Sequence, residues 1–321
     1  MPVVAHHVLR ARVGIVILNY RTPAMVADVL QSLDQQVEAV GGHVVVVDND
    51  SGDGSEQQIG EFIHQAGFSA WAHVMGAGNN GGFSAGMNAG MRALDAEFYM
   101  LLNSDTLVRP GAVAQLLRDM EAHEHVGIGS PRLEWMDGTP QVSCFRDPSP
   151  TSEFVSAAAT RQITRLLHDH VVALPVSDED VDVEWTSFAC VMIRRAVLEQ
   201  LGLMDEGYFM YYEDADFCRS AREVGFGVRH FPRARVVHLR GGSSEVKSRQ
   251  AQKKRPPQYL YAARNRYFRK HYGLSGAISA NVSWSCGRGI HLLRETLFRA
   301  EPTSCEREWL DKWHGLFDFK R

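Results

Sequence analysis

Apolar runs and helix-like patterns alternate along the first 125 residues of the chain. Four runs rich in apolar residues occupy residues 12–20, 43–48, 69–75 and 97–103. Between them, apolar residues recur every three or four positions, as at Val26, Val29 and Leu33, which predicts helices. Apolar strands separated by helices are typical of a parallel sheet with both faces covered.

Helix start signals follow the first two strands. Thr22 and Pro23 predict an N-cap followed by proline in the first turn. Ser55 and Gln58 have the spacing of a capping box, and Asp53 is expected to form an Asx turn at the same helix start.

The pattern changes after residue 125. Residues 126–145, with the turn signal Asp137-Gly138 between two apolar segments, predict a β-hairpin. Residues 213–226 predict a helix, and the chain from about residue 245 onward reads as basic and helical. Further strands are expected at residues 183–195, 227–231 and 235–239.

Composition narrows the class of protein. The 321 residues, 45% of them hydrophobic, suffice for one large α/β domain with a helical appendage. A net charge of -4 does not indicate a nucleic-acid partner. Five scattered cysteines without a CxxC pair fit a reducing cytoplasm. The first apolar run is too short for a signal peptide, and no run is long enough to predict a membrane span.

Polar residues follow all four strands of the first half. They are Asn19-Tyr20, Asp48-Asn49-Asp50, Asn79-Asn80 and Asn103-Ser104-Asp105. One such strand end would be an ordinary turn, but four at the carboxyl edge of one sheet predict a ligand site. A carboxylate such as Asp48 can accept the N3–H of uracil or thymine, a proton that cytosine lacks.

Two further features of the first half suit a diphosphate. The segment 78–90, "GNNGGFSAGMNAG", can offer backbone N–H groups to a phosphate, although Gly86 and Gly90 also suit close helix packing. Asp105 has no basic neighbour in the following turn, which favours a divalent cation held by oxygen ligands. The alternative is that Asp105 caps the helix that begins near Pro110.

The second half adds acids and a histidine. Glu213, Asp214 and Asp216 cluster at a helix start after an aromatic run. Acids are favoured at helix N-termini, but one of the three could be a general base beside a sugar site walled by the aromatics. His238 ends a strand before "RGGSS" and is either structural or a metal or phosphate ligand.

The C-terminal part contains a positively charged segment, although the net charge of the whole chain is negative. Residues 247–270 contain nine Lys or Arg and no Asp or Glu, with aromatic residues between them. This block could hold an anionic acceptor or membrane headgroups, or it could be a solvated helix face. The tail from Ser275, with Leu292, Leu293 and Leu297, could pack on the domain, on a second subunit or on a membrane.

Taken in order, these segments resemble glycosyltransferase family 2, in particular its bacterial rhamnosyltransferase-like branch, over residues 12–272. The matching stretches are "ILNY", "VVVVDNDSGDGS", "NNGGFSAGMNAG", "LLNSDTLVRPGA", "YFMYYEDADFC" and "HLRGGSS". The resemblance implies a GT-A type α/β nucleotide-binding fold with a mostly parallel central sheet, plus a C-terminal helical extension. It places the GT-A domain at residues 1–245, with a nucleotide-binding half (1–125) and an acceptor half (126–245), and the extension at 246–321.

The resemblance also implies roles for individual residues. Asp214 matches the catalytic base of the family's "ED" motif, with Glu213 and Asp216 beside it. Asp105 matches the last acid of the metal-binding DXD motif, whose first acid is Asn103 here, and His238 is similar to a cation or diphosphate contact. The donor nucleotide would be held by Asn19, Tyr20, Asp48, Asp50, Asn80 and Ser104.

The function so implied is an inverting, Mg²⁺- or Mn²⁺-dependent sugar transfer in cell-surface polysaccharide synthesis. The donor would be a dTDP- or UDP-sugar, by analogy a rhamnose donor, and the acceptor a glycan or a polyprenyl-diphosphate-linked hydroxyl. The expected location is the cytoplasm, with peripheral contact at the inner face of the membrane through residues 247–270. The alternatives are a nucleotide-sugar-forming nucleotidyltransferase and a catalytically silent nucleotide-sugar-binding protein.

Overall fold

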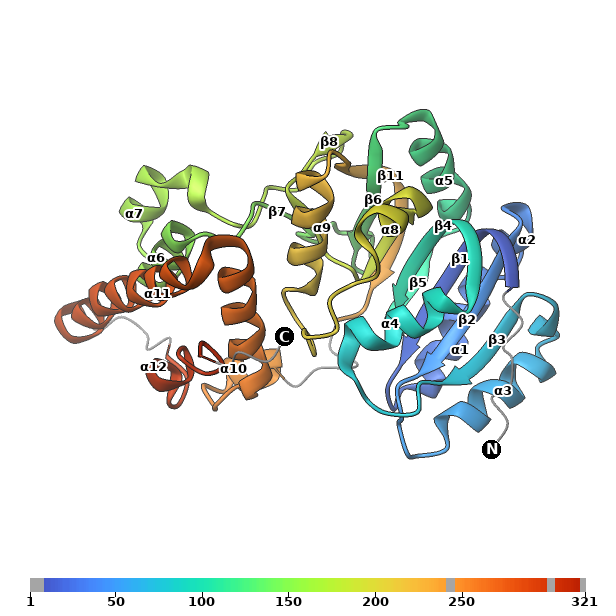
Figure 1. Ribbon diagram of the computed structural model, residues 1–321, viewed down its shortest axis with the longest axis horizontal. Helices are drawn as coiled ribbons and strands as arrows, with labels where there is room; N and C mark the ends of the chain where they lie inside the picture. The colour runs from blue at the N-terminus through green and yellow to red at the C-terminus, as the bar shows by residue number, and fades with distance from the viewer. Residues whose placement is uncertain (1–8, 241–245, 299–303, 318–321) are drawn as a thin grey trace.

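A computed structural model of the protein describes residues 9–240, 246–298 and 304–317. Its centre is a nine-stranded sheet in the order β3-β2-β1-β4-β10-β6-β11-β5, with β8 paired to β11 (Figure 1). The first four strands in the chain run parallel to one another, and each overlaps one of the four apolar runs predicted as strands. They are β1 (Leu9–Asn19), β2 (Gly42–Asp48), β3 (Ala72–Gly76) and β4 (Leu94–Asn103).

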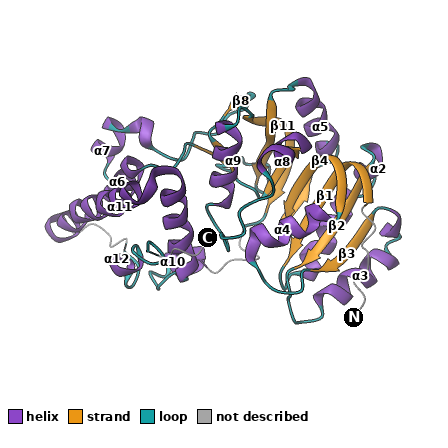
Figure 2. Ribbon diagram, in the orientation of Figure 1, coloured by secondary structure: helices purple, strands orange, loops and turns teal. Residues whose placement is uncertain are grey.

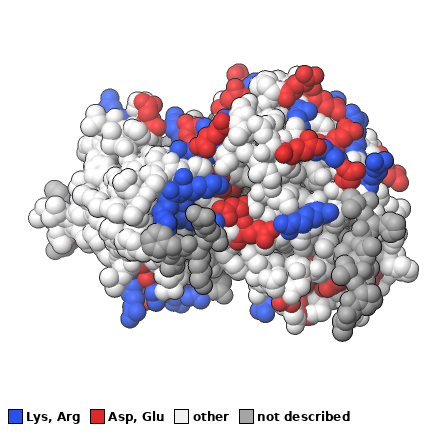
Figure 3. Space-filling view, viewed as in Figure 1, with Lys and Arg blue, Asp and Glu red and all other residues white. Residues whose placement is uncertain are grey.

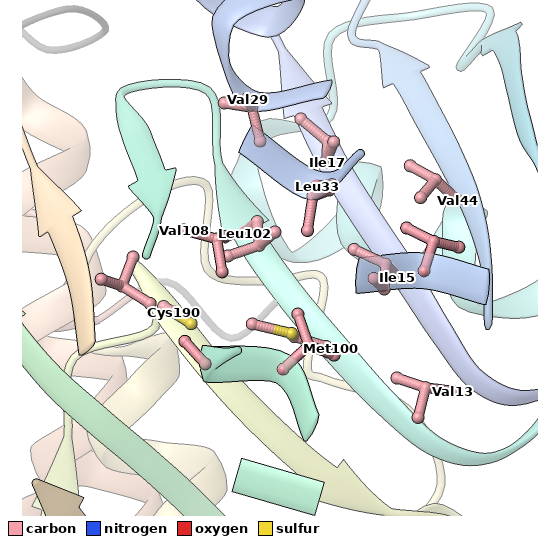
Figure 4. Packing of buried hydrophobic residues seen from close by; sticks show 14 of the residues in the cluster. Val13, Ile15, Ile17, Val29, Leu33, Val44, Met100, Leu102, Val108 and Cys190 are labelled. Carbon is pink, nitrogen blue, oxygen red and sulfur yellow. The ribbon is translucent and has the colours of Figure 1, made fainter. Parts of the chain in front are cut away.

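Helices cover both faces of the sheet, as the apolar strands predict (Figure 2). Alternate side chains of β1 point to opposite faces, so Ile15 and Ile17 join one core cluster and Val16 joins another. Figure 4 shows Ile15, Ile17 and Val29 within the first cluster. That face is covered by α1 (Pro23–Leu33), α3 (Ser55–Gln65) and α5 (Ala112–Ala122), and the other by α4 (Gly82–Arg92), α8 (Arg195–Leu201) and α9 (Glu213–Glu223).

The second half of the chain completes the sheet with mixed strand directions. β10 lies antiparallel to both β4 and β6, whereas β11 lies parallel to β6 and antiparallel to β5. The strands are β5 (Thr106–Val108), β6 (Val126–Glu134), β8 (Val181–Asp182), β10 (Cys190–Arg194) and β11 (Gly227–His238). The sheet is therefore mostly parallel in its first half and mixed in its second.

Several predicted elements differ from the observed ones. The strand expected over 183–195 is split into β9 (Trp185–Thr186), which pairs with β7 (Cys144–Phe145), and β10. The hairpin over 126–145 shrinks to a turn and a single bridge between Glu134 and Pro140, because the chain then leaves β6 to pair with β9. The two strands expected at 227–231 and 235–239 form one strand, with a register shift around Pro232.

The start of α3 also differs from the prediction. Gly54 is the N-cap, so Ser55 does not form a capping box with Gln58. Instead the Ser55 hydroxyl and backbone N–H donate to the Asp53 carboxylate, at 2.5 and 3.0 Å. The expected Asx turn at Asp53 is confirmed. Thr22 is the N-cap of α1, but its hydroxyl bonds to Asn19 and Ser104 and not to the helix backbone.

The C-terminal helices project to one side of the sheet (Figure 1). The long helix α11 bends at Gly273, whose φ of 70° is readily adopted by glycine. Before the bend, α11 packs against Tyr208 and Ala215 in a third core cluster, and after it α11 packs along α6. The boundary at residue 245 remains a prediction. The C-terminal helices are α10 (Val246–Ala251), α11 (Gln258–Phe298) and α12 (Glu308–Asp311). Two helices from the middle of the chain are α6 (Pro150–Ala158) and α7 (Arg161–Leu166).

Candidate active site

The carboxyl ends of β1 and β2 form the floor of the candidate site. The pairing of Asn19 with Asp48 in the parallel ladder places their side chains next to each other. The Asn19 amide donates to Asp48 Oδ1 at 2.6 Å, and the Ser51 hydroxyl donates to the same oxygen at 2.6 Å. All three side chains are buried. The Ser51 backbone N–H also donates to Asp48 Oδ2 at 3.1 Å. Sequence reasoning missed Ser51, although a serine three residues after a strand-end aspartate is within reach of its carboxylate.

The end of β4 joins this network through Thr22. The Thr22 hydroxyl lies 2.8 Å from the Ser104 hydroxyl and 3.1 Å from Asn19 Oδ1. Three strand ends that are far apart in sequence therefore share one hydrogen-bonded edge. The prediction of a common polar edge is confirmed for Asn19, Asp48 and Ser104.

A second network joins the glycine-rich segment to the second half of the chain. The Asn49 amide donates to Asn80 Oδ1 at 3.0 Å, and the backbone N–H of Gly82 donates to the same oxygen at 3.1 Å. The backbone N–H of Phe83 then donates to the carbonyl of Phe209 at 2.7 Å. The start of α4 is thus held against the aromatic segment that precedes α9.

Two predicted nucleotide contacts lie at the rim of this edge. Tyr20 is partly buried, with the Arg21 guanidinium 5.1 Å from its ring centroid, an arrangement that suits stacking. Asp50 is exposed and has a left-handed φ of 56°, which asparagine and aspartate tolerate in tight turns. Their contacts with a nucleotide remain predictions.

Asp105 and His238 come together because β5 and β11 are antiparallel neighbours. The register pairs Thr106 with His238, and the backbone N–H of Leu239 donates to the Asp105 carbonyl at 2.9 Å. His238 Nε2 lies 3.5 Å from Asp105 Oδ1, and both side chains are largely buried. The two residues predicted as metal contacts are therefore neighbours, although the "GGSS" stretch predicted beside them falls outside the described residues.

This pair fits a cation shared with a substrate better than a metal cage made by the protein alone. Within residues 9–240, 246–298 and 304–317, no three His, Cys, Asp or Glu side chains gather as a metal site. Mg²⁺ is usually held by one or two protein ligands together with substrate phosphates and water. Two ligand atoms that each lie about 2.1 Å from one ion can be up to about 4 Å apart, so the spacing of Asp105 and His238 is compatible with one ion.

The first turn of α9 carries two carboxylates in an unusual environment. Tyr211 and Tyr212, which precede it, both have left-handed backbones with φ of 74° and 68°; such strain is concentrated at functional sites. Burial raises the pKa of Asp214 to about 6. Burial and the neighbouring charge of Asp214 raise the pKa of Glu213 well above its usual value. Burial therefore disfavours the charged form of both carboxyls.

Backbone hydrogen bonds connect Asp214 to the end of β4. The Phe188 N–H donates to the Asp214 carboxylate. The next residue, Ala189, accepts the backbone N–H of Asn103 at 3.0 Å. Asn103 lies two residues before Asp105, so residues 188 and 189 connect the proposed base to the segment that carries the proposed cation ligand.

The contacts of Asp216 argue against the catalytic role predicted for it. Its side chain is 3% exposed, and its two oxygens lie 2.6 Å from Lys270 Nζ and 2.7 Å from His271 Nε2. These partners belong to α11. Asp216 therefore joins α9 to the C-terminal helix, a structural role that requires long-range pairing and could not be deduced from local sequence.

The basic block at 247–270 is also largely engaged within the protein. The side chain of Lys247 is not among those described, but four of the other cations pair with acids at 2.6–2.8 Å: Arg255 with Asp311, Arg264 with Glu153, Arg266 with Asp205, and Lys270 with Asp216. Tyr261, Tyr267 and Phe268 are buried. Much of this block therefore builds the helical part of the fold, so the solvated-face interpretation is wrong for these residues.

A pocket of about 340 Å³ lies beside β6 and β11, and none of the predicted site residues lines it. Its lining includes Arg132, Val142, Val176 and His230. Gln141, which also lines it, donates to the carbonyl of His238 at 2.7 Å. The pocket thus adjoins the site but does not coincide with it.

The sequence comparisons agree with this geometry. The family model described as "Glycosyltransferase like family 2" matches residues 11–273, most of the chain. The chain therefore belongs to glycosyltransferase family 2, and the resemblance stated from its motifs is confirmed. No helix among the described residues is long and apolar enough to cross a membrane.

Two relatives place the chain within the family. The low-salt glycan biosynthesis hexosyltransferase Agl10 of Haloferax volcanii is 28% identical over 230 residues, which is 70% of this chain and 66% of the relative. An N-acetylglucosaminyl-diphospho-decaprenol L-rhamnosyltransferase of Mycobacterium tuberculosis is 24% identical over 226 residues, which is 63% of this chain and 67% of the relative. The chain thus spans about two thirds of the length of these relatives, and they support the rhamnosyltransferase-like branch.

Solved structures confirm the GT-A-like fold. The mannosyltransferase PcManGT of Pyrobaculum calidifontis, in complex with GDP-Man and Mn²⁺, has a TM-score of 0.57 at 14% identity, covering 90% of this chain and 76% of its own. GalNAc-T7 with UDP, GalNAc and Mn²⁺ has a TM-score of 0.59 at 14% identity, covering 89% and 55%. TarS of S. aureus in complex with UDP has a TM-score of 0.52 at 14% identity, covering 90% and 73%.

Proposed function

We propose that the protein transfers a sugar from a nucleoside-diphosphate donor to an acceptor hydroxyl, with inversion at the anomeric carbon. The observation that carries the proposal is the tie between Asp214 and the end of β4. This connection supports a site in which the donor sugar lies between a proton acceptor on one side and the diphosphate on the other. Transfer by family 2 members and by the named hexosyl- and rhamnosyltransferase relatives supports the same reaction class.

The donor half of the proposal rests on the strand ends. Asn19, Asp48 and Tyr20 would hold a pyrimidine base, and Asn80 with the loop after it would face the ribose and the diphosphate. Asp48 has four acceptor positions and receives three hydrogen bonds, from Asn19 and twice from Ser51. One position therefore remains for the N3–H of uracil or thymine.

Asp105 and His238 would hold a divalent cation, Mg²⁺ or Mn²⁺, together with the donor phosphates. A cation held there would offset the negative charge that develops on the departing diphosphate. The Mn²⁺ in the complexes of PcManGT and GalNAc-T7 is consistent with this use. Arg240, whose charge interacts with Asp105, would add to the positive potential at the same place.

Asp214 would accept the proton of the acceptor hydroxyl. A carboxylate with a pKa near 6 is mostly ionised at neutral pH and is a stronger base than an ordinary aspartate. Direct attack of the activated hydroxyl would invert the anomeric centre in one displacement.

The acceptor we propose is a lipid-linked glycan for cell-surface polysaccharide synthesis. The decaprenol-linked substrate in the name of the mycobacterial relative supports this choice. Rhamnose from dTDP-rhamnose is the donor sugar that this branch favours. Localisation at the inner face of the cell membrane follows from such an acceptor.

The proposal is tested by nucleoside diphosphate release from dTDP-rhamnose and UDP-sugars, with Mg²⁺ or Mn²⁺ and with or without a polyprenyl-diphosphate-linked acceptor. Acceptor-dependent release is the expected result. Pyrophosphate consumption and nucleotide-sugar formation would instead favour the nucleotidyltransferase alternative. Donor binding without turnover on any acceptor would favour the silent binding protein.

A further inference from the structure

The part of α11 that follows the bend at Gly273 presents a long apolar face to solvent. Its exposed apolar side chains are Leu274 (41%), Ile278 (37%), Val282 (49%), Leu292 (37%), Leu293 (62%) and Leu297 (72%). Spacings of four and multiples near 3.6 put them on one side of the helix. At 1.5 Å per residue, the stretch from Leu274 to Leu293 is about 30 Å long.

This face is also free of charge. Between Leu274 and Leu297, the Lys, Arg, Asp and Glu residues are Arg288, Arg294 and Glu295. Arg294 donates to the Ala159 carbonyl. Arg288 is buried and bonds to Ser304 and Glu295. The exposed residues between the leucines are small or weakly polar, such as Ser279 and Cys286. The end of the molecule at which α11 lies is correspondingly almost white in Figure 3.

The opposite face of the same helix already packs inside the protein. Ala277, Ala280 and Trp284 are buried, and Gly287 is so close to α6 that an added Cβ would lie 2.4 Å from the Phe154 carbonyl. The exposed leucines are therefore not needed for packing on the domain. An uncharged apolar stripe of this length on a surface indicates a contact with another apolar phase.

The charge around the stripe decides between a lipid surface and a second copy of the chain. Residues 247–294 contain eleven Lys or Arg and no Asp or Glu. Five of them pair with acids outside this range: Arg255, Arg264, Arg266, Lys270 and Arg288. The charge that faces solvent comes from other cations. Lys253 and Lys254 are exposed, as are Arg161 and Arg165 of α7. A two-fold contact through this part would bring surfaces of the same sign together, which is unfavourable. An anionic lipid surface would attract them.

We propose that residues 274–297 of α11 lie in the interface of an anionic membrane, with Leu274, Ile278, Val282, Leu293 and Leu297 in contact with the acyl chains. The helix would lie along the surface, a mode that suits a helix with one apolar face. The membrane contact predicted for residues 247–270 thereby moves to the helix after the bend, because four of the earlier cations pair with acids of the protein.

The same helix connects the surface to the candidate site. Before the bend, the Tyr259 ring lies 5.2 Å from that of Phe209 and stacks at 6.5 Å on Tyr211. Lys270 and His271 hold Asp216 of α9. A helix fixed in the interface would therefore hold the α9 side of the site toward the bilayer. The membrane contact itself does not depend on the proposed chemistry.

Sedimentation of the full chain with vesicles tests the contact. We expect binding to phosphatidylcholine vesicles that contain about one third phosphatidylglycerol, and weaker binding to phosphatidylcholine alone. Replacing Ile278, Val282 and Leu293 by Gln should weaken binding to the anionic vesicles about tenfold or more. A wild-type chain that stays in the supernatant, or a triple variant that binds as well as wild type, would overturn the proposal.

A matched control separates this face from apolar exposure in general. Met136→Gln, Val142→Gln and Val224→Gln remove three residues with exposures of 58%, 39% and 37% elsewhere on the protein, against 37%, 49% and 62% on α11. This control should bind vesicles like wild type. Donor affinity, measured on the same samples, should be unchanged in the α11 variant. Unchanged donor affinity shows that the donor site is folded. Vesicle binding and donor binding therefore report separately on this proposal and on the proposed function.

Cys286 provides a direct probe of what covers the face. It is exposed there, whereas Cys144, Cys190 and Cys218 are buried. An environment-sensitive fluorophore on Cys286 of a Cys305→Ser chain should shift to the blue with anionic vesicles. The same label at Gln57→Cys, on exposed α3 of a chain without Cys286 and Cys305, should not shift. A blue shift that depends on protein concentration without lipid would indicate a second copy and contradict the proposal.

Discussion

His238 Nε2 lies 3.5 Å from Asp105 Oδ1, although the two residues belong to different halves of the chain. The antiparallel pairing of β5 with β11 brings them together. The distance is longer than an ordinary N–H···O hydrogen bond and is compatible with a shared ion. Asp105 and His238 are therefore the residues to change in a test of metal binding.

Removal of either residue should weaken binding of Mn²⁺ in the presence of a nucleoside diphosphate. We expect a loss of about tenfold to a hundredfold for Asp105→Asn and for His238→Ala, because each removes one of two protein ligands. The affinity is measured from the electron paramagnetic resonance signal of the Mn²⁺ that remains free. Asp53→Asn, an exposed turn residue, is the control and should bind Mn²⁺ like wild type. Equal affinity in all four chains would exclude this pair as the metal site.

The pH dependence of transfer should report the state of Asp214. Because a base must be ionised to accept a proton, kcat/KM should rise with pH through an apparent pKa of about 6. An activity that is flat from pH 5 to pH 8, measured with saturating metal, would show that the rate does not depend on this carboxylate.

The same shift has a consequence for stability. A folded pKa above the unfolded value means that the folded state binds the proton more tightly, so stability from Asp214 is lost as pH rises from about 4 to about 6. Asp214→Asn, which stays neutral, should therefore be more stable than wild type by about 1–3 kcal/mol at pH 8, with a smaller difference at pH 4. Urea denaturation at the two pH values measures this, and an Asn variant that is less stable at pH 8 would contradict the burial argument.

Asp216 should matter for stability more than for chemistry. Asp216→Asn leaves Lys270 and His271 without their buried partner, so we expect a loss of about 3 kcal/mol or more. Thermal and urea unfolding measure the loss. Arg10→Gln, which breaks an ion pair whose arginine is 91% exposed, should change little. A fully stable Asp216→Asn chain that has lost transfer would restore the catalytic role that the motif implies.

Gly82 should tolerate no side chain. A Cβ there would lie 2.0 Å from the Phe209 carbonyl oxygen, and the backbone φ is 86°. Gly82→Ala should separate α4 from the segment before α9 and weaken donor binding. Gly52→Ala is the matched control, because its φ of 67° brings the same backbone strain with no atom within 4 Å, a cost of about 1–2 kcal/mol. If calorimetry finds the same donor affinity for both variants, the contact with Phe209 is not required by the site.

The parallel half of the fold and its polar edge follow from local sequence. Buried strands such as β1 and β2 are continuous apolar runs, and the carboxyl ends of parallel strands must meet at one edge. The sequence alone therefore predicts that Asn19, Asp48 and Ser104 lie close together. The pairing of Asn19 with Asp48 in the ladder agrees with that reasoning.

The mixed half could not be read in the same way. The strand expected over 183–195 divides because residues 185–186 pair with β7 while residues 190–194 pair with β4 and β6. Such a choice of partner depends on contacts between distant segments. The acid partners of Arg264 and Lys270 were hidden for the same reason, since Glu153 and Asp216 lie far away in the sequence. A basic run can thus be a set of internal ion pairs.

The central claim is that Asp214 takes the acceptor proton while the donor is held elsewhere. The most direct measurement compares Asp214→Asn with wild type in two assays on one preparation: donor affinity by calorimetry and sugar transfer to the lipid-linked acceptor. We expect Asp214→Asn to bind the donor within about twofold of wild type and to transfer the sugar about 10²-fold or more slowly. Transfer at the wild-type rate, or loss of donor binding together with transfer in a folded variant, would contradict it.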